Sequence, residues 1–100
     1  MSDEDLIIES VVSTAENLEE MEDPDELELM DVKYMVSSHG HVTEVYGVYT
    51  VGGPYIEIRM LSCTVFGSWG SDQHTTHFNN DVIKGYGEHL ADMFEYNIDV

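Results

Sequence analysis

The chain has 100 residues and a formal charge of −18, because 21 Asp and Glu stand against only three Lys and Arg. This length predicts a single small domain, and a hydrophobic content of 42% is enough for a modest core. So few bases argue against direct binding to nucleic acid and against binding to anionic membranes, since both need clustered Lys and Arg.

Cysteine content and hydropathy bear on where the protein resides. Cys63 is the sole cysteine, so no internal disulfide can form. The sequence shows neither a basic-then-apolar leader nor an apolar run of about 18 residues. We therefore expect a soluble, intracellular protein.

The first segment predicts an amphipathic helix over roughly residues 3 to 22, with Ser2 and Asp5 placed like a capping box. Apolar residues recur at helical spacing, at Ile7, Val11, Ala15, Leu18 and Met21. A stripe of acids lies opposite them, at Asp5, Glu9, Glu16, Glu20 and Asp23. At about 100° per residue these acids fall within roughly 60° of one another.

The segment that follows this helix is ambiguous. Asp23 and Pro24 break the helix, and together with Glu26 they could equally start a short second one, so residues 24–30 stay open. From Asp31 onward alternating apolar residues predict a strand, and residues 37–40 supply a turn into the next one.

A β-hairpin is predicted between Val42 and Phe66, hinged at residues 52–54. Its first run carries apolar residues on both parities, which predicts a strand that is covered on both faces. In the second run the apolar parity changes after Met60. This change indicates either a bulge near residues 60 and 61 or a strand end that is buried on both sides.

After the hairpin, residues 67–71 predict a loop and residues 73–78 a short fourth strand at an edge of the sheet. Asn79 or Asn80 then caps a helix over roughly residues 80 to 96.

This C-terminal helix is also amphipathic, although Gly85 and Gly87 weaken it. Its apolar face holds Ile83, Tyr86, Leu90, Met93 and Phe94. A second acidic stripe runs along this helix at Asp81, Glu88, Asp92 and Glu95, and Asp99 continues it just past the end of the helix. The stripe residues are expected to point away from the apolar face.

Together these elements predict an α+β domain, a three- to four-stranded antiparallel sheet with the N-terminal and C-terminal helices packed on one face. The reason is that the apolar faces of both helices need a common apolar surface.

Candidates for catalysis or metal binding are few. Zinc ligands could come from Cys63 and the histidines, which are His39, His41, His74, His77 and His89. No CxxC or HExxH pairing is present, so exposed histidines in strands and turns are the favoured interpretation. A cysteine within an apolar run is typical of a buried, inert thiol. We expect no catalytic residue, no metal and no cofactor, and hence no enzyme.

Folding does not explain the acidic charge. Like charges at i, i+4 destabilise a helix by roughly 0.2 to 0.5 kcal/mol per pair, and a solvated surface normally mixes both signs. The stripes could imitate the phosphates of DNA and occupy a basic groove. Alternatively, the charge keeps the protein hydrated in the salt-rich cytoplasm of a halophilic organism, where it indicates no partner. The low alanine content, Ala15 and Ala91 only, argues mildly against salt adaptation.

In size and acidic composition the chain resembles the phage-encoded inhibitors of bacterial defence, the anti-CRISPR and anti-restriction proteins. This resemblance covers no alignable motif and carries over no residue. It implies a non-enzymatic inhibitor in the host-cell cytoplasm, with a DNA-handling partner such as a CRISPR surveillance complex or a restriction enzyme. The expected contact residues are the acids of the two helices, Asp5, Glu9, Glu16, Glu20, Asp23, Asp81, Glu88, Asp92 and Glu95. A homodimer through the hairpin edge remains an alternative.

Overall fold

The computed structural model describes residues 3–23, 26–51 and 54–98, which form a two-layer α+β domain. Its elements in chain order are α1 (Asp3–Glu20), β1 (Asp31–Val36), β2 (Val42–Thr50), β3 (Tyr55–Arg59), β4 (Thr64–Trp69), β5 (Asp72–His77) and α2 (Asp81–Ile98). The predicted class, an antiparallel sheet with terminal helices, is confirmed, but the sheet has five strands instead of three to four. The predicted cap at Ser2, the break at Pro24 and the hinge at residues 52 and 53 lie outside the described residues.

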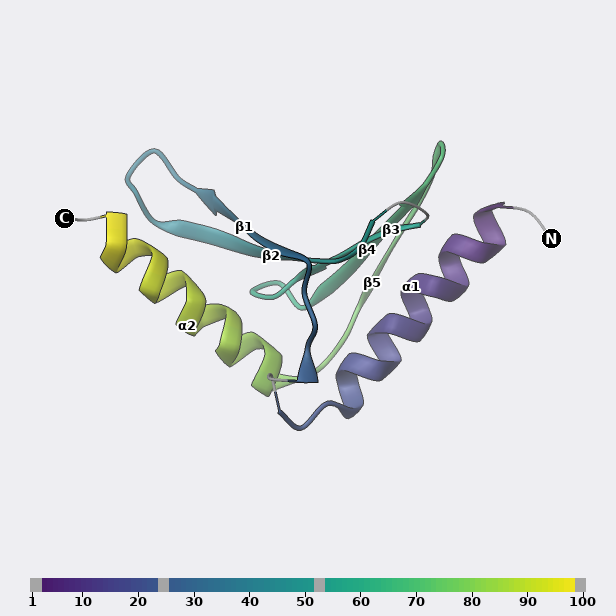
Figure 1. Cartoon of the computed structure of the whole chain (residues 1–100), viewed down its shortest axis with the longest axis horizontal. Coiled ribbons are helices and arrows are strands. Elements are labelled where there is room, and N and C mark those ends of the chain that lie inside the picture. The colour runs from purple at the N-terminus through teal and green to yellow at the C-terminus, as the bar shows by residue number, and fades with distance from the viewer. Residues whose placement is uncertain (1–2, 24–25, 52–53, 99–100) are drawn as a thin grey trace.

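The sheet is an antiparallel meander in the order β1-β2-β3-β4-β5, so each strand pairs with the next one along the chain. The predicted edge strand over residues 73–78 is confirmed as β5. Helix α1 packs against β4 and β5, whereas α2 packs against β2. In Figure 1 both helices lie below the sheet and diverge from a common corner, and the upper face of the sheet carries no helix. None of the helices in the described part of the chain is long and apolar enough to cross a membrane.

The expected loop over residues 67–71 is wrong, because β4 continues to Trp69. Trp69 pairs with Asp72, so Gly70 and Ser71 alone form the turn into β5. Gly70 has a φ of 62°, which glycine adopts without strain and which two-residue hairpin turns require.

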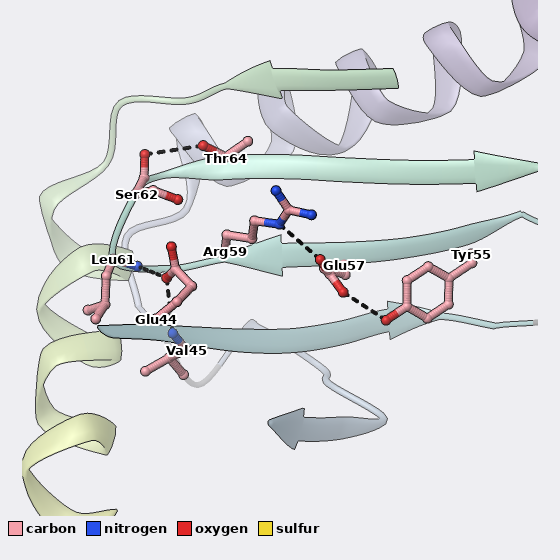
Figure 2. Close-up of polar contacts among 8 residues, drawn as sticks. All are labelled: Glu44, Val45, Tyr55, Glu57, Arg59, Leu61, Ser62 and Thr64. Atoms are coloured by element: carbon pink, nitrogen blue, oxygen red, sulfur yellow. Dashed lines mark hydrogen bonds and ion pairs between the residues drawn. The ribbon is translucent and has the colours of Figure 1, made fainter. Parts of the chain in front are cut away.

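The change of parity after Met60 has an explanation that the sequence did not indicate. Residues 60–63 form a turn between β3 and β4, instead of a bulge or a doubly buried strand end. The Glu44 carboxylate accepts hydrogen bonds from the backbone N–H groups of Val45 and Leu61, which attach this turn to β2 (Figure 2). Each of the two strands therefore keeps its own alternation.

The core lies between the sheet and the helices. Ile58 and Val65 on the sheet, Val11 on α1 and Ile83 on α2 have no exposed surface. The segment between α1 and β1 contributes Leu27, which is buried in the same cluster. The helices and this segment therefore share one apolar surface with the sheet.

Two glycines allow the helices to approach the sheet closely. A Cβ at Gly67 in β4 would collide with Val11 of α1, and a Cβ at Gly87 in α2 would lie 2.5 Å from the Cβ of Met60. Gly85 by contrast faces open space. Gly87 is therefore needed for the close packing of α2 against Met60. From the sequence alone it indicated only a weakened helix.

Strand β2 is covered by helices on one face only, so the expected cover on both faces is wrong. Val48 lies on the open face and is only 4% exposed, although it does not belong to the core cluster. Asp31 and Glu57 are its cross-strand neighbours. Apolar residues of both parities in β2 thus reflect an open face on which neighbouring side chains shield one another.

Candidate partner-binding surface

The acids of α1 lie on its solvent side. Glu9, Glu16 and Glu20 are exposed, as is Asp5 in the first turn. Ile7 and Val11 on the opposite side are fully buried, so packing of the apolar face fixes which way the acids point. At about 1.5 Å per residue the stripe from Asp5 to Glu20 is about 22 Å long.

Helix α2 presents a shorter acidic stripe. Asp81, Glu88 and Asp92 are exposed on the side opposite to Ile83. Lys84, which is also exposed, lies within one turn of both Asp81 and Glu88. The predicted stripe is therefore at the surface, with one base in it.

Glu95 does not share the exposure of that stripe. Its carboxylate accepts a hydrogen bond from the backbone N–H of Val42, and its Oε1 lies 3.9 Å from Nδ1 of His41. Only 32% of its side chain is exposed. The expectation that Glu95 points to solvent is wrong, because it holds the C-terminal part of α2 to the start of β2. Residues 53 positions apart make this contact, which helical periodicity does not reveal.

The two stripes meet at a corner that Asn80 forms. Its side-chain amide donates hydrogen bonds to the carbonyl groups of Leu18 and Met21 at the end of α1. Its Oδ1 accepts a hydrogen bond of 2.9 Å from Val82 N and so caps α2, as one of the two predicted candidates. Figure 1 shows the end of α1 and the start of α2 at this corner. Exposed acids of both stripes, Glu20 and Asp81, therefore lie at the helix ends that meet here.

The exposed acids beside this corner extend the surface further. Glu22 and Asp23, which follow α1, are both exposed, as are Glu26 and Glu28 in the segment that leads to β1. We call the exposed carboxylates of α1, of α2 and of residues 22, 23, 26 and 28 the acidic helix layer. Lys84 is its only base within the described residues.

The open face of the sheet carries a different polar arrangement, which the sequence did not predict. Glu57 accepts hydrogen bonds of 2.9 Å from the Tyr55 hydroxyl and from Nε of Arg59 (Figure 2). The guanidinium carbon of Arg59 lies 4.9 Å from the ring centroid of Phe66 and 5.8 Å from that of Tyr46. Arg59 is thus held between two aromatic rings and one carboxylate.

Burial, followed by the hydrogen bond to Glu57, raises the pKa of Tyr55 to about 12. The Tyr55 hydroxyl therefore keeps its proton at neutral pH and donates it to Glu57. Alternation along β3 could have placed Tyr55, Glu57 and Arg59 on one face of the sheet. It does not indicate that these side chains form hydrogen bonds with one another.

The candidate metal and thiol residues are not assembled into a site. In residues 3–23, 26–51 and 54–98 no group of three or more His, Cys, Asp and Glu is placed to hold a metal ion. His77 instead lies 3.4 Å from the hydroxyl of Thr64 through Nδ1. Burial above all raises the pKa of the Cys63 thiol, and the thiol donates to the Met60 carbonyl oxygen at 3.6 Å. A protonated thiol of this kind is a poor nucleophile.

Comparison of the chain with protein-family models, with curated proteins and with solved structures finds no match. Charge and geometry are what indicate a function.

Proposed function

We propose that the protein is a non-enzymatic inhibitor that imitates the charge of DNA and occupies the DNA-binding groove of a basic defence complex. A CRISPR surveillance complex or a restriction enzyme has such a groove. The observation that carries the proposal is the acidic helix layer, in which exposed carboxylates lie on two helices whose ends meet at Asn80. The resemblance in size and composition to phage-encoded inhibitors supports bacterial defence as the setting.

The spacing of these acids is comparable with that of duplex phosphates. Asp5 and Glu9, like Glu16 and Glu20, are four residues apart, which is about 6 Å along a helix. The phosphates of one DNA strand follow one another about every 3.4 Å along the axis, so the two densities agree within about a factor of two. The longest dimension of the molecule is 51 Å, which equals about 15 base pairs at that rise.

The bases lie where they neutralise this surface least. Lys33 and Arg59 belong to the open face of the sheet, which leaves Lys84 alone among the acids of the helix layer. Repulsion between these acids opposes folding, and it becomes attraction when the layer meets a basic groove. A basic partner therefore accounts for the segregation of charge better than hydration of the surface does.

Competition with DNA tests the proposal. Wild-type protein should displace a labelled duplex from a purified CRISPR surveillance complex or restriction enzyme. Its affinity should fall steeply with salt, because exposed charges are screened beyond about 10 Å at 0.1 M. Changing Glu9, Glu16 and Glu20 together to Lys should weaken binding at least about tenfold if α1 is the contact surface, since each change replaces attraction by repulsion. Changing Glu88 and Asp92 to Lys tests α2 in the same way, and Glu95 is left intact because it holds Val42.

A pair of variants with equal net charge provides the control. Glu88→Gln with Asp92→Asn removes two negative charges from the helix layer. Gln73→Lys with Thr75→Lys makes the same change in net charge on β5, where both side chains are exposed on the open face. We expect only the first pair to weaken binding. The proposal fails if all of these variants bind every DNA-handling complex as the wild type does.

A further inference from the structure

The strand register arranges the open face of the sheet in two neighbouring rows that run across all five strands. The first row contains two of the three bases of the chain, and its members are Lys33, Tyr46, Arg59, Thr64 and His77. The second row contains two acids, and its members are Asp31, Val48, Glu57, Phe66 and Thr75. The rows are two residues apart along each strand, which is about 7 Å.

This face combines partly exposed aromatic rings with an arginine that has hydrogen-bond donors unused by the described residues. Tyr46, Tyr55 and Phe66 are each half-buried, and 34% of the Arg59 side chain is exposed. Among the described residues Arg59 donates hydrogen bonds to Glu57 alone, so its two terminal nitrogen atoms remain available to an acceptor outside the chain. Aromatic rings and arginine are the side chains that interfaces most often use as anchors.

We propose that this open face docks against the same face of a second copy of the chain. A two-fold axis that runs across the strands, between the two rows, places the first row of one copy over the second row of the other. Arg59 then meets Glu57 of the second copy, and Lys33 meets Asp31 of the second copy. Each of these contacts occurs twice, because a two-fold interface is self-complementary.

Other symmetric arrangements lack this match. A two-fold axis parallel to the strands would place Arg59 over Arg59 and Glu57 over Glu57, and like charges in direct opposition disfavour association. Pairing through the acidic helix layer would bring carboxylates against carboxylates. With the axis across the strands, the two packed sheets lie between the two helix layers. The acidic layers are then on opposite outer sides of the dimer.

Salt should strengthen this dimer. Each copy carries a formal charge of −18, so long-range repulsion opposes association and is reduced when salt screens it. The contacts between Arg59 and Glu57 become buried in the interface, where screening is much weaker. Binding of the helix layer to a basic groove has the opposite salt dependence, so the two contacts can be told apart. The dimer does not depend on the proposed inhibitory function.

Sedimentation equilibrium of the full chain tests the inference. We expect a shift from the monomer mass of 11.3 kDa towards twice that mass as KCl is raised from about 0.05 M to about 0.5 M, a range in which screening increases strongly. Arg59→Glu places a carboxylate against Glu57, and Glu57→Arg places a guanidinium against Arg59, so either change should weaken self-association at least about tenfold. An equimolar mixture of these two variants should form a heterodimer, because all charges in the interface are then opposite in sign.

Matched variants on α2 control for net charge. Lys84→Glu changes the net charge as Arg59→Glu does, and Glu88→Arg changes it as Glu57→Arg does, but both lie outside the open face. They should dimerise within about threefold of the wild type, as expected for charges remote from an interface. If circular dichroism shows that a change on β3 unfolds the chain, Lys33→Glu, alone and together with Asp31→Lys, repeats the test at exposed positions. Lys33→Glu alone should weaken the dimer, and adding Asp31→Lys should restore it, because the two charges are then exchanged and again oppose each other. A chain that stays monomeric at high salt, or a dimer that none of the single face changes weakens, overturns the inference.

Discussion

The helix layer and the open face of the sheet differ in how their charges are arranged: the helix layer is almost entirely acidic, whereas the open face pairs acids with bases. On the helix layer carboxylates such as Glu16 and Glu20 lie one turn apart, and Lys84 is the only base of this layer in the part of the chain that the structure describes. On the open face Arg59 and Glu57 form an ion pair of 2.9 Å between aromatic rings. The charge excess is therefore a property of one layer, and it is not spread evenly over the protein. This separation is why we propose a basic partner for the helix layer and a second copy of the chain for the open face of the sheet.

The largest effect is expected where the helix layer is attached to the sheet. Gly87→Ala forces α2 away from Met60, because the new Cβ would lie 2.5 Å from the Cβ of Met60. We expect the free energy of unfolding to fall by about 1 to 3 kcal/mol, as is typical of overpacked cores. Urea denaturation measures it.

Gly85→Ala in the same helix is the matched control. No atom lies within 4 Å of a Cβ at Gly85. This change should therefore stabilise the protein by about 0.5 to 1 kcal/mol, the ordinary helix preference of alanine over glycine. If the Gly87→Ala variant is as stable as the Gly85→Ala variant, then α2 does not approach Met60 as closely as described.

Salt should have a smaller effect on stability, and it acts mainly through the helix layer. We expect the domain to be folded in dilute buffer, with a free energy of unfolding that rises as added KCl screens the repulsion between its acids. Circular dichroism and urea denaturation from about 0.05 M to about 3 M KCl cover weak to nearly complete screening. Loss of structure below molar salt would instead indicate a salt-adapted protein, whose charge says nothing about a partner.

The smallest effect on stability is expected at high pH, where Tyr55 on the open face loses its proton. The pKa of Tyr55 is about 12 in the folded protein, against an ordinary value of 10.0. The folded state therefore holds this proton more tightly than the unfolded state. The stability that it contributes is fully present below about pH 10 and is lost as the pH rises through 12.

Urea denaturation of the wild type and of Tyr55→Phe at pH 9, 10.5 and 12 measures this loss, with both proteins compared at each pH. Tyr55→Phe should lose less stability than the wild type across this range. Equal losses would mean that neither burial nor the hydrogen bond to Glu57 raises the pKa of the Tyr55 hydroxyl.

Local patterns predicted much of the fold. Period-two alternation located β1, and residues with a high strand propensity located β5. The helical spacing of residues such as Ile7 and Val11 identified α1 and the direction in which its acids point. These features depend on neighbours within one or two turns, which the sequence displays directly.

The features that were missed depend on residues distant in sequence. Glu95 is turned away from the solvent-exposed stripe because it accepts a hydrogen bond from the backbone N–H of Val42. Gly67 lies in β4 under α1, where a Cβ would collide with Val11. The pairing of Glu57 with Arg59 on an uncovered face was also missed, because apolar residues on both parities of β2 indicated cover on both sides. Periodicity reports which face of an element is apolar, but not which element covers it.

The hydrogen bonds of Asn80 have a consequence for folding during synthesis, because they join an early part of the chain to a late one. Its side chain joins Leu18 to the start of α2 across 62 positions of the chain, and so adds a distant hydrogen bond to the local one that the Leu18 carbonyl accepts from the backbone N–H of Met21. A contact of such long sequence separation requires closure of a long loop, whose entropy is lost before the contact forms. On the ribosome α1 is made first, but the carbonyl groups of Leu18 and Met21 receive their bonds from Asn80 only after residue 80 has emerged. The two acidic stripes therefore come together as one surface only in the finished protein.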